Sequence, residues 1–217
     1  MKGTLGGILF LFALLLGTHK VPGFKNWLIL PDFTLSPDSF PVHLYLNFDK
    51  PLIGIFLIGF GLKTIRSLKD WWLVFKTTLP IILCASVTLL GLSFVTGYVR
   101  LDLKWFEFSW LWLLVNLLFT CVAEEALFRG FLQEQLSKGM QHWRFGTAGS
   151  WIIASVLFGL VHFPAGRSYA FLATVAGLFY GYAYLKTRRI EASILVHFSV
   201  NAIHFLAFTY PALKGAF

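Results

Sequence analysis

The stretch WFEFSWLWLLVNLLFTCVAEEALFRGFLQEQL, residues 105–136, decides the fold. It is one long helical pattern that is apolar at first and becomes polar toward its end. A helix needs about 20 mostly apolar residues to cross the hydrocarbon core of a bilayer, and the apolar part of this stretch approaches that length. We therefore predict a membrane-spanning helix that carries ionisable side chains.

The rest of the chain repeats this apolar pattern. By the same length criterion, the sequence predicts an all-α fold, a multi-spanning transmembrane bundle of about seven helices. The short span near Pro51 is expected to take in Leu44–Phe48 as well. The further candidate spans are Gly3–Gly17, Pro51–Leu62, Thr77–Val99, Thr147–Phe163, Ser168–Leu185 and Ile190–Tyr210.

The segments between the spans carry their own predictions. Residues 21–50 hold four of the eight prolines and several Asp and Asn residues, so we expect an irregular loop. Residues 63–76 mix basic side chains with two Trp and a Phe, a pattern typical of a helix at the membrane surface. Gly3–Gly17 resembles a signal peptide but lacks a small-x-small cleavage site, which predicts a retained anchor.

Composition favours a membrane protein and argues against nucleic-acid binding. The 217 residues are 57% hydrophobic and 13% charged, with a mean hydropathy of +0.73, whereas a soluble domain is roughly a quarter charged. The net charge of +8 comes from basic residues between apolar runs, and an N-terminus in the cytoplasm would place 11 of the 18 on that side. Cys84 and Cys121 lie in apolar stretches and are expected to be small core residues.

Ionisable side chains inside a span are costly and by default mark function. The first cluster is EEALFR, residues 124–129. At 100° per residue, Glu125 and Arg129 share one helix face and can form an ion pair, while Glu124 points roughly 140° away from Arg129. Glu124 would then be free to exchange protons. The alternative is a charged helix end at the membrane interface.

The other two clusters contain histidines. His162, at the end of the stretch 158–162, titrates near neutrality and could share a proton with a carboxylate or bind a metal; a solitary interfacial histidine is the alternative. His197, Asn201 and His204 share one helical stripe. Their alternative role is to hydrogen-bond neighbouring helices together.

Depth arithmetic predicts that the clusters meet. Glu124 and His162 are twelve and fifteen residues above the turn that joins their helices, and Asn201 is eleven residues along its own span. At a rise of 1.5 Å per residue, these positions lie about 18, 22 and 16 Å deep. We therefore expect one shared site near mid-membrane.

These side chains suit hydrolysis of an amide bond. A carboxylate and an imidazole that share a water can act as a general base pair, and a second histidine with an asparagine can donate to a developing oxyanion. Neither a Gly-x-Ser-x-Gly motif nor an HExxH zinc motif is present. One Glu and two His could still ligate zinc with an open position, so zinc is the alternative to a site without a cofactor.

The motifs EExxxR at 124–129, FxxxH at 158–162 and HxxxN at 197–201 resemble the three ordered motifs of the CPBP family, the CAAX prenyl proteases and bacteriocin-processing (Abi) proteins. The resemblance covers residues 105–210 as a CPBP-like catalytic core and leaves 1–104 as an N-terminal membrane-spanning region. It implies a glutamate-dependent intramembrane endopeptidase. Its substrate would be a membrane-anchored or lipidated protein in the lipid bilayer, cut near the C-terminus. The chain is short for a eukaryotic prenyl protease and has no obvious trafficking signal, so we expect a prokaryotic cell membrane.

Carried over position by position, the resemblance implies a role for each motif residue. Glu124 and His162 would activate the water, and His197 and Asn201 would stabilise the oxyanion. A metal-free mechanism is preferred because this Glu–His pair is sufficient to polarise water.

The remaining motif residues would support the site. Glu125 and Arg129 would form a supporting ion pair. Phe158 and His204 are candidates to contact the catalytic side chains without touching the substrate. The rival hypothesis is a non-enzymatic membrane scaffold, such as an immunity or transporter-like protein. A third hypothesis is a proton or ion pathway through the same side chains.

Overall fold

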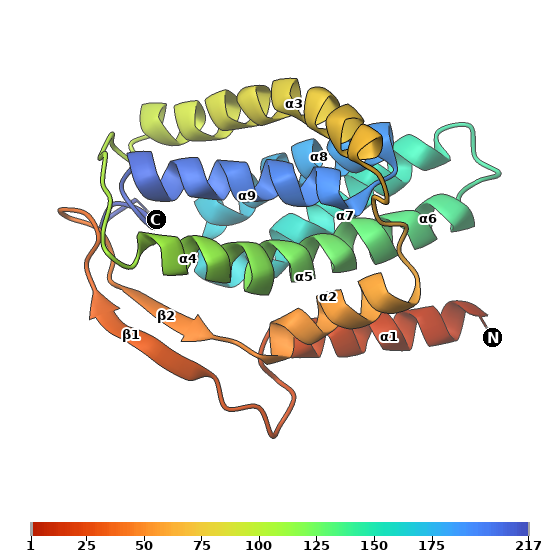
Figure 1. Ribbon diagram of the computed structural model, residues 1–217, viewed down its shortest axis with the longest axis horizontal. Helices are drawn as coiled ribbons and strands as arrows, with labels where there is room; N and C mark the ends of the chain where they lie inside the picture. The colour runs from red at the N-terminus through yellow and green to blue at the C-terminus, as the bar shows by residue number, and fades with distance from the viewer. Residues whose placement is uncertain (1, 217) are drawn as a thin grey trace.

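Seven helices run side by side along the long axis of the molecule (Figure 1), in a computed structural model that describes residues 2–216. This confirms the predicted helical bundle within that range. The seven are α1 (Lys2–Gly17), α2 (Asp49–Phe60), α3 (Leu68–Val95), a continuous helix from Ser109 to Gly139, α7 (Gly146–Val161), α8 (Arg167–Thr187) and α9 (Ile190–Ala207), besides a single 3₁₀ turn at Phe163–Ala165.

Three of the helices between residues 2 and 216 are long and apolar enough to cross a membrane by themselves. They are Leu68–Val95, Ser109–Gly139 and Ile190–Ala207. Gly7–Gly17 and Gly146–Val161 are apolar but shorter. The chain is thus an integral membrane protein.

The long helix at the centre changes its winding along its length. It consists of α4 (Ser109–Val115), the π-helix η1 (Asn116–Cys121), α5 (Val122–Glu125), the π-helix η2 (Ala126–Gln133) and α6 (Glu134–Gly139). A π-helix bonds residue i to i+5, and such stretches inside α-helices are frequently found at functional sites. The two carboxylates of the EExxxR motif therefore lie on a short α-helical turn between two π-helical stretches.

This helix begins four residues later than predicted, because the preceding segment pairs with the end of α9. The backbone N–H groups of Asp102 and Lys104 donate to the carbonyls of Ala207 and Leu206, each at 2.9 Å. The Ser109 hydroxyl accepts from the N–H of Phe106 at 2.8 Å, where the helix starts.

The predicted irregular loop at 21–50 is wrong, because it contains a hairpin. Strand β1 (Trp27–Phe33) pairs antiparallel with β2 (Val42–Leu46), so Leu44–Phe48 does not extend α2. The pairing register shifts between Leu30 and Phe33. Pro31 lies in that irregular stretch, where a strand tolerates a residue without an N–H donor. The hairpin lies at the end of the bundle where α4 starts (Figure 1).

The predicted surface helix at 63–76 is present only in its second part, where residues 68–76 form the start of α3. Residues 62–67 are not helical, and α3 begins at Leu68, where the Ser67 hydroxyl accepts from the N–H of Asp70 at 3.1 Å. The non-helical segment is bound to the start of α9 instead. The N–H of Ile65 donates to the Glu191 carboxylate at 2.6 Å, which explains why the backbone leaves the helical path here.

The main hydrophobic core draws on both halves of the chain. Buried residues of α1, α2 and α3 pack with residues of the long helix, α7, α8 and α9 in one cluster. Residues of α3 spaced three or four apart, such as Ile81, Ala85 and Leu89, face this core. Cys121 is buried, as predicted, but Cys84 is exposed, because it lies on the outward face of α3.

Candidate functional site

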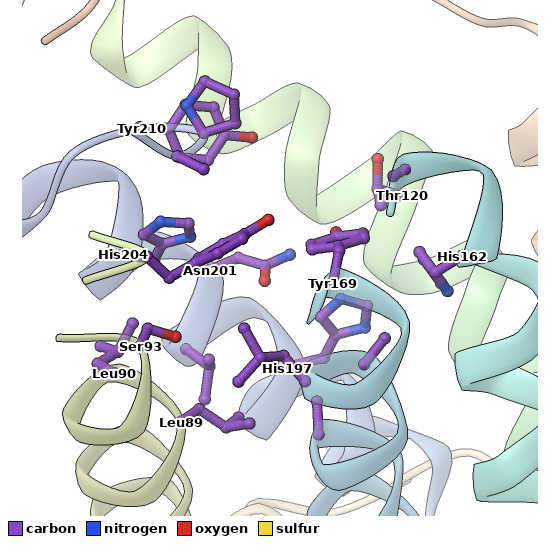
Figure 2. Close-up of a pocket in the computed structure, with 18 of the residues that line it drawn as sticks. Leu89, Leu90, Ser93, Thr120, His162, Tyr169, His197, Asn201, His204 and Tyr210 are labelled. Carbon is purple, nitrogen blue, oxygen red and sulfur yellow. The ribbon is translucent and has the colours of Figure 1, made fainter. Parts of the chain in front are cut away.

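The polar clusters predicted to converge do line one cavity. It has a volume of about 560 Å³ and lies among α3, the long helix, α7, α8 and α9. Figure 2 shows His197, Asn201 and His204 at this cavity together with His162 and Thr120 from neighbouring segments. The predicted site residues that line it are Glu124, Phe158, His162, His197, Asn201 and His204.

Glu124 and His162 face each other at the cavity wall. Oε2 of Glu124 is 4.0 Å from Nε2 of His162, and both side chains are about one-fifth exposed. Nδ1 of His162 lies 2.7 Å from the carbonyl oxygen of Phe158. A carbonyl can only accept, so Nδ1 carries a proton and Nε2 is the nitrogen that faces the carboxylate. The separation exceeds a direct hydrogen bond and is a distance that one water can bridge.

The second carboxylate, Glu125, is wholly buried and holds two donors. Its Oε1 accepts from Nη1 of Arg129 at 3.1 Å, so the predicted ion pair is present. The same oxygen accepts from Nδ1 of His197 at 2.8 Å. Since a carboxylate only accepts, this contact leaves Nε2 of His197 as the nitrogen available to the cavity. The sequence spacing did not reveal that Glu125 binds the α9 histidine.

Arg129 is fixed by its surroundings as well as by its partner. It is fully buried, its Nη2 donates to the carbonyl of Gly177 at 3.1 Å, and its guanidinium carbon lies 4.4 Å from the centre of the Phe158 ring. An added Cβ at Gly177 would be 3.2 Å from Nη2 and 3.1 Å from Cα of Ser155. The glycine thus permits α8 to approach the charged cluster. Phe158 lies behind the cluster, with its ring 6.1 Å from that of His197.

Two further residues of the site, both on the long helix, were not predicted from the sequence. Asn116 accepts a hydrogen bond from Nδ2 of Asn201 at 3.3 Å and another from the Cys121 thiol at 3.3 Å. Thr120 lines the cavity one turn further on. Asn116, Thr120 and Glu124 are spaced four apart within an apolar span, a polar stripe that could have pointed to them.

Lys50 was also missed as a neighbour of Glu124. Its Nζ lies 3.6 Å from Oε1 of Glu124, with the lysine side chain 21% exposed. Lys50 belongs to α2, far along the chain from Glu124, and the sequence pattern places it at the end of the polar loop 21–50. Nothing in its local pattern distinguished it from the other basic residues between spans.

The segment after α9 also lines the cavity, near His204. Nε2 of His204 donates to the carbonyl of Thr209 at 3.1 Å, and the ring of Tyr210 lies 5.1 Å from that of His204. His204 thus binds the C-terminal segment rather than contacting Glu124 or His162.

The arrangement of the acidic and histidine side chains bears on the zinc alternative. Among residues 2–216, no group of three or more His, Cys, Asp or Glu side chains is placed to hold a metal ion. Glu125 and His197 are engaged with each other, and no further carboxylate or histidine completes a set with Glu124 and His162 in that range.

Fold and site together define a polytopic membrane protein with a cavity among its helices that is lined by carboxylate, imidazole and amide side chains. Residues 105–203 match the family model described as Type II CAAX prenyl endopeptidase Rce1-like. This part of the chain is a domain of that family, within the wider CPBP or Abi group, which confirms the resemblance seen in the motifs. Membership implies a protease with protein substrates. No match was found among curated proteins or among solved structures.

Proposed function

We propose that this protein is an intramembrane endopeptidase that hydrolyses a peptide bond near the C-terminus of a membrane-anchored or lipidated protein. The observation that carries the proposal is the Glu124–His162 pair, with 4.0 Å between the facing oxygen and nitrogen, on the wall of a 560 Å³ cavity. The family supports proteolysis in general, and this geometry supports a specific way of activating water.

In the proposed reaction, a water molecule lies between Oε2 of Glu124 and Nε2 of His162. The pair takes a proton from the water as its oxygen forms a bond to the carbonyl carbon of the substrate. The C–N bond then breaks, and the proton passes to the leaving amine. The products are a shortened chain with a new carboxylate and a free C-terminal peptide.

His197 and Asn201 are proposed to stabilise the oxyanion that forms on the carbonyl oxygen. Asn201 would donate from its amide nitrogen, and His197 from Nε2 in its doubly protonated form, because Nδ1 already donates to Glu125. Both line the cavity, and each is held by a second residue, His197 by Glu125 at 2.8 Å and Asn201 by Asn116 at 3.3 Å. Donors held in place before the reaction lose little to reorganisation, which makes such electrostatic stabilisation effective.

The cavity walls favour an apolar substrate segment. Away from the polar side chains, the lining consists largely of aliphatic and aromatic residues, among them Leu89, Leu90, Leu172 and Ala173. A lipid chain or the apolar tail of an anchored protein would bury its surface there. The prokaryotic cell membrane remains our prediction for the location.

The test uses the full-length protein in proteoliposomes, with an internally quenched peptide that ends in a farnesylated CAAX sequence. Mass spectrometry of the products locates the cut. Glu124→Gln and His162→Ala should each lower kcat at least about 100-fold, the usual contribution of general acid–base catalysis. Glu107→Gln and His142→Ala are matched controls, because both residues are exposed and outside the cavity.

Two results would count against the proposal. One is a wild-type protein that cleaves neither this peptide nor an unlipidated apolar peptide of the same length. The other is a Glu124→Gln variant that cleaves at the wild-type rate. If the two site variants fail to fold while the wild type is inactive, the scaffold hypothesis gains support.

A further inference from the structure

The two adjacent carboxylates of the long helix have separate cationic partners. Glu125 binds Arg129 and His197, both at its Oε1. Glu124 has Lys50 at 3.6 Å from Oε1 and His162 at 4.0 Å from Oε2. The two oxygens of Glu124 therefore face different groups, the ammonium on one side and the imidazole on the other.

Close helix packing places Lys50 beside Glu124. Gly54 is one helical turn after Lys50 on α2, and an added Cβ there would lie only 2.9 Å from Cγ1 of Val122 on α5. Glycine thus brings α2 against the turn that carries Glu124. The start of α2 is also anchored, because Nδ1 of His19 lies 2.6 Å from the buried carboxylate of Asp49.

A second cavity, of about 180 Å³, lies on the Lys50 side of the pair. Glu124 and His162 line both cavities, whereas Lys50 lines the smaller one and is not among the residues of the larger. Lys50 therefore reaches Glu124 from behind, without facing the larger cavity in which we place the substrate.

We propose that Lys50 is a positioning residue of the catalytic site, supplied by a helix outside the family-matched residues 105–203. Its ammonium holds Oε1 of Glu124, so that Oε2 stays turned toward His162 with its charge available to the water. This inference rests on the proposed function, and it adds that the N-terminal helices complete the site rather than only anchor it.

The position of Lys50 predicts a particular kinetic signature. A residue that orients the base without touching the substrate acts on the chemical step, so its loss should lower kcat and leave KM almost unchanged. Lys50→Met keeps the length of the side chain and removes the charge, and we expect kcat to fall about tenfold to 100-fold, as for a misplaced reacting group. Lys50→Arg keeps the charge and should retain most of the activity.

Lys69→Met is the matched control, because it removes the same charge from an exposed position on α3. A second pair of variants tests the placement of α2. Gly54→Ala should lower kcat by pushing the helix away from Val122, and Gly54→Ala combined with Val122→Ala should restore part of it, because the added methyl then has room.

An infrared measurement decides the pairing without relying on cleavage. The band of the Glu124 carboxylate is isolated as the difference between each protein and its Glu124→Gln form. In Lys50→Met this band should shift, or give way to that of a protonated carboxyl, and Lys69→Met should leave it unchanged. If the wild type cleaves no peptide but the band responds, the proposed function fails and the pairing stands.

The inference is overturned by any of three results. These are a Lys50→Met variant with kcat within about twofold of wild type, an equal loss of kcat in Lys50→Arg, and a Glu124 band that does not respond to Lys50→Met. Thermal unfolding of each variant checks that a loss of kcat is not a loss of folded protein.

Discussion

Replacing Arg129 by Met should destabilise the protein far more than an equivalent change at the surface. Arg129 is fully buried, and its guanidinium donates to Glu125 and to the carbonyl of Gly177, each at 3.1 Å. Removing it leaves a carboxylate and a carbonyl in the protein interior without that donor. A buried charge that loses its partner is costly, whereas an exposed one is solvated by water.

The magnitude follows from these contacts. Breaking a buried ion pair by removing one member costs about 3–5 kcal/mol. The lower end applies here, because His197 still donates to Glu125 at 2.8 Å and compensates part of its charge. For a protein of this size, about 3 kcal/mol corresponds to a fall in Tm of about 6–12 °C.

The matched control is Lys138→Met. Lys138 pairs with Glu134 at the same i,i+4 spacing on the same helix, but its side chain is 63% exposed. Such a pair contributes about 0.5 kcal/mol or less. The assay is thermal unfolding in a Cys84→Ser background, followed with a maleimide dye that becomes fluorescent when buried Cys121 is exposed.

A double variant separates the charge from the packing. Glu125→Gln combined with Arg129→Met removes both charges, and its Tm should lie above that of Arg129→Met alone, since no uncompensated carboxylate remains. A Tm for Arg129→Met within about 2 °C of wild type would refute this reasoning. So would a double variant that is less stable than the single one by the full cost of a second buried defect.

Three further predictions concern packing, the site and acidity. Gly177→Ala should lower the Tm, because its Cβ would crowd the buried guanidinium at 3.2 Å, whereas Gly91→Ala, with nothing within 4 Å, should not. Asn116→Ala should lower kcat about tenfold with little change in KM, because the α9 asparagine loses the acceptor that orients it. Burial by itself raises the pKa of Asp102. Hydrogen bonds from Ser36 and Lys104, together with the charge of Lys104, nevertheless bring this pKa below its usual 3.8. The ionised Asp102 therefore stabilises the fold fully above about pH 4, and this stabilisation is lost as the pH falls further. Unfolding of Asp102→Asn, followed against pH, should change less on acidification than unfolding of the wild type.

Much of the fold could be predicted because membrane-spanning helices satisfy their own backbone hydrogen bonds. Each apolar stretch therefore indicates a helix by itself, and the seven predicted helices are present between residues 2 and 216. The hairpin at Trp27–Leu46 could not be predicted in this way. Its strands depend on pairing with each other across a loop, and Pro31 hides the strand pattern.

In the site, the sequence by itself determined the contacts that arise within one helix and the depth that several helices share. The spacing of four placed Glu125 and Arg129 together, and the rise of 1.5 Å per residue brought Glu124, His162 and Asn201 to a similar depth.

Only the tertiary structure decided how each helix is rotated and which helices are neighbours. Packing at Gly177 gave Arg129 its second acceptor, and packing at Gly54 brought Lys50 to Glu124. The rotation of α5 and α9 about their axes also brings Glu125 and His197 into hydrogen-bond contact. The physical reason is that helical periodicity sets angles and distances along one axis, whereas the partner across an interface depends on the fit of side chains from segments far apart in the chain.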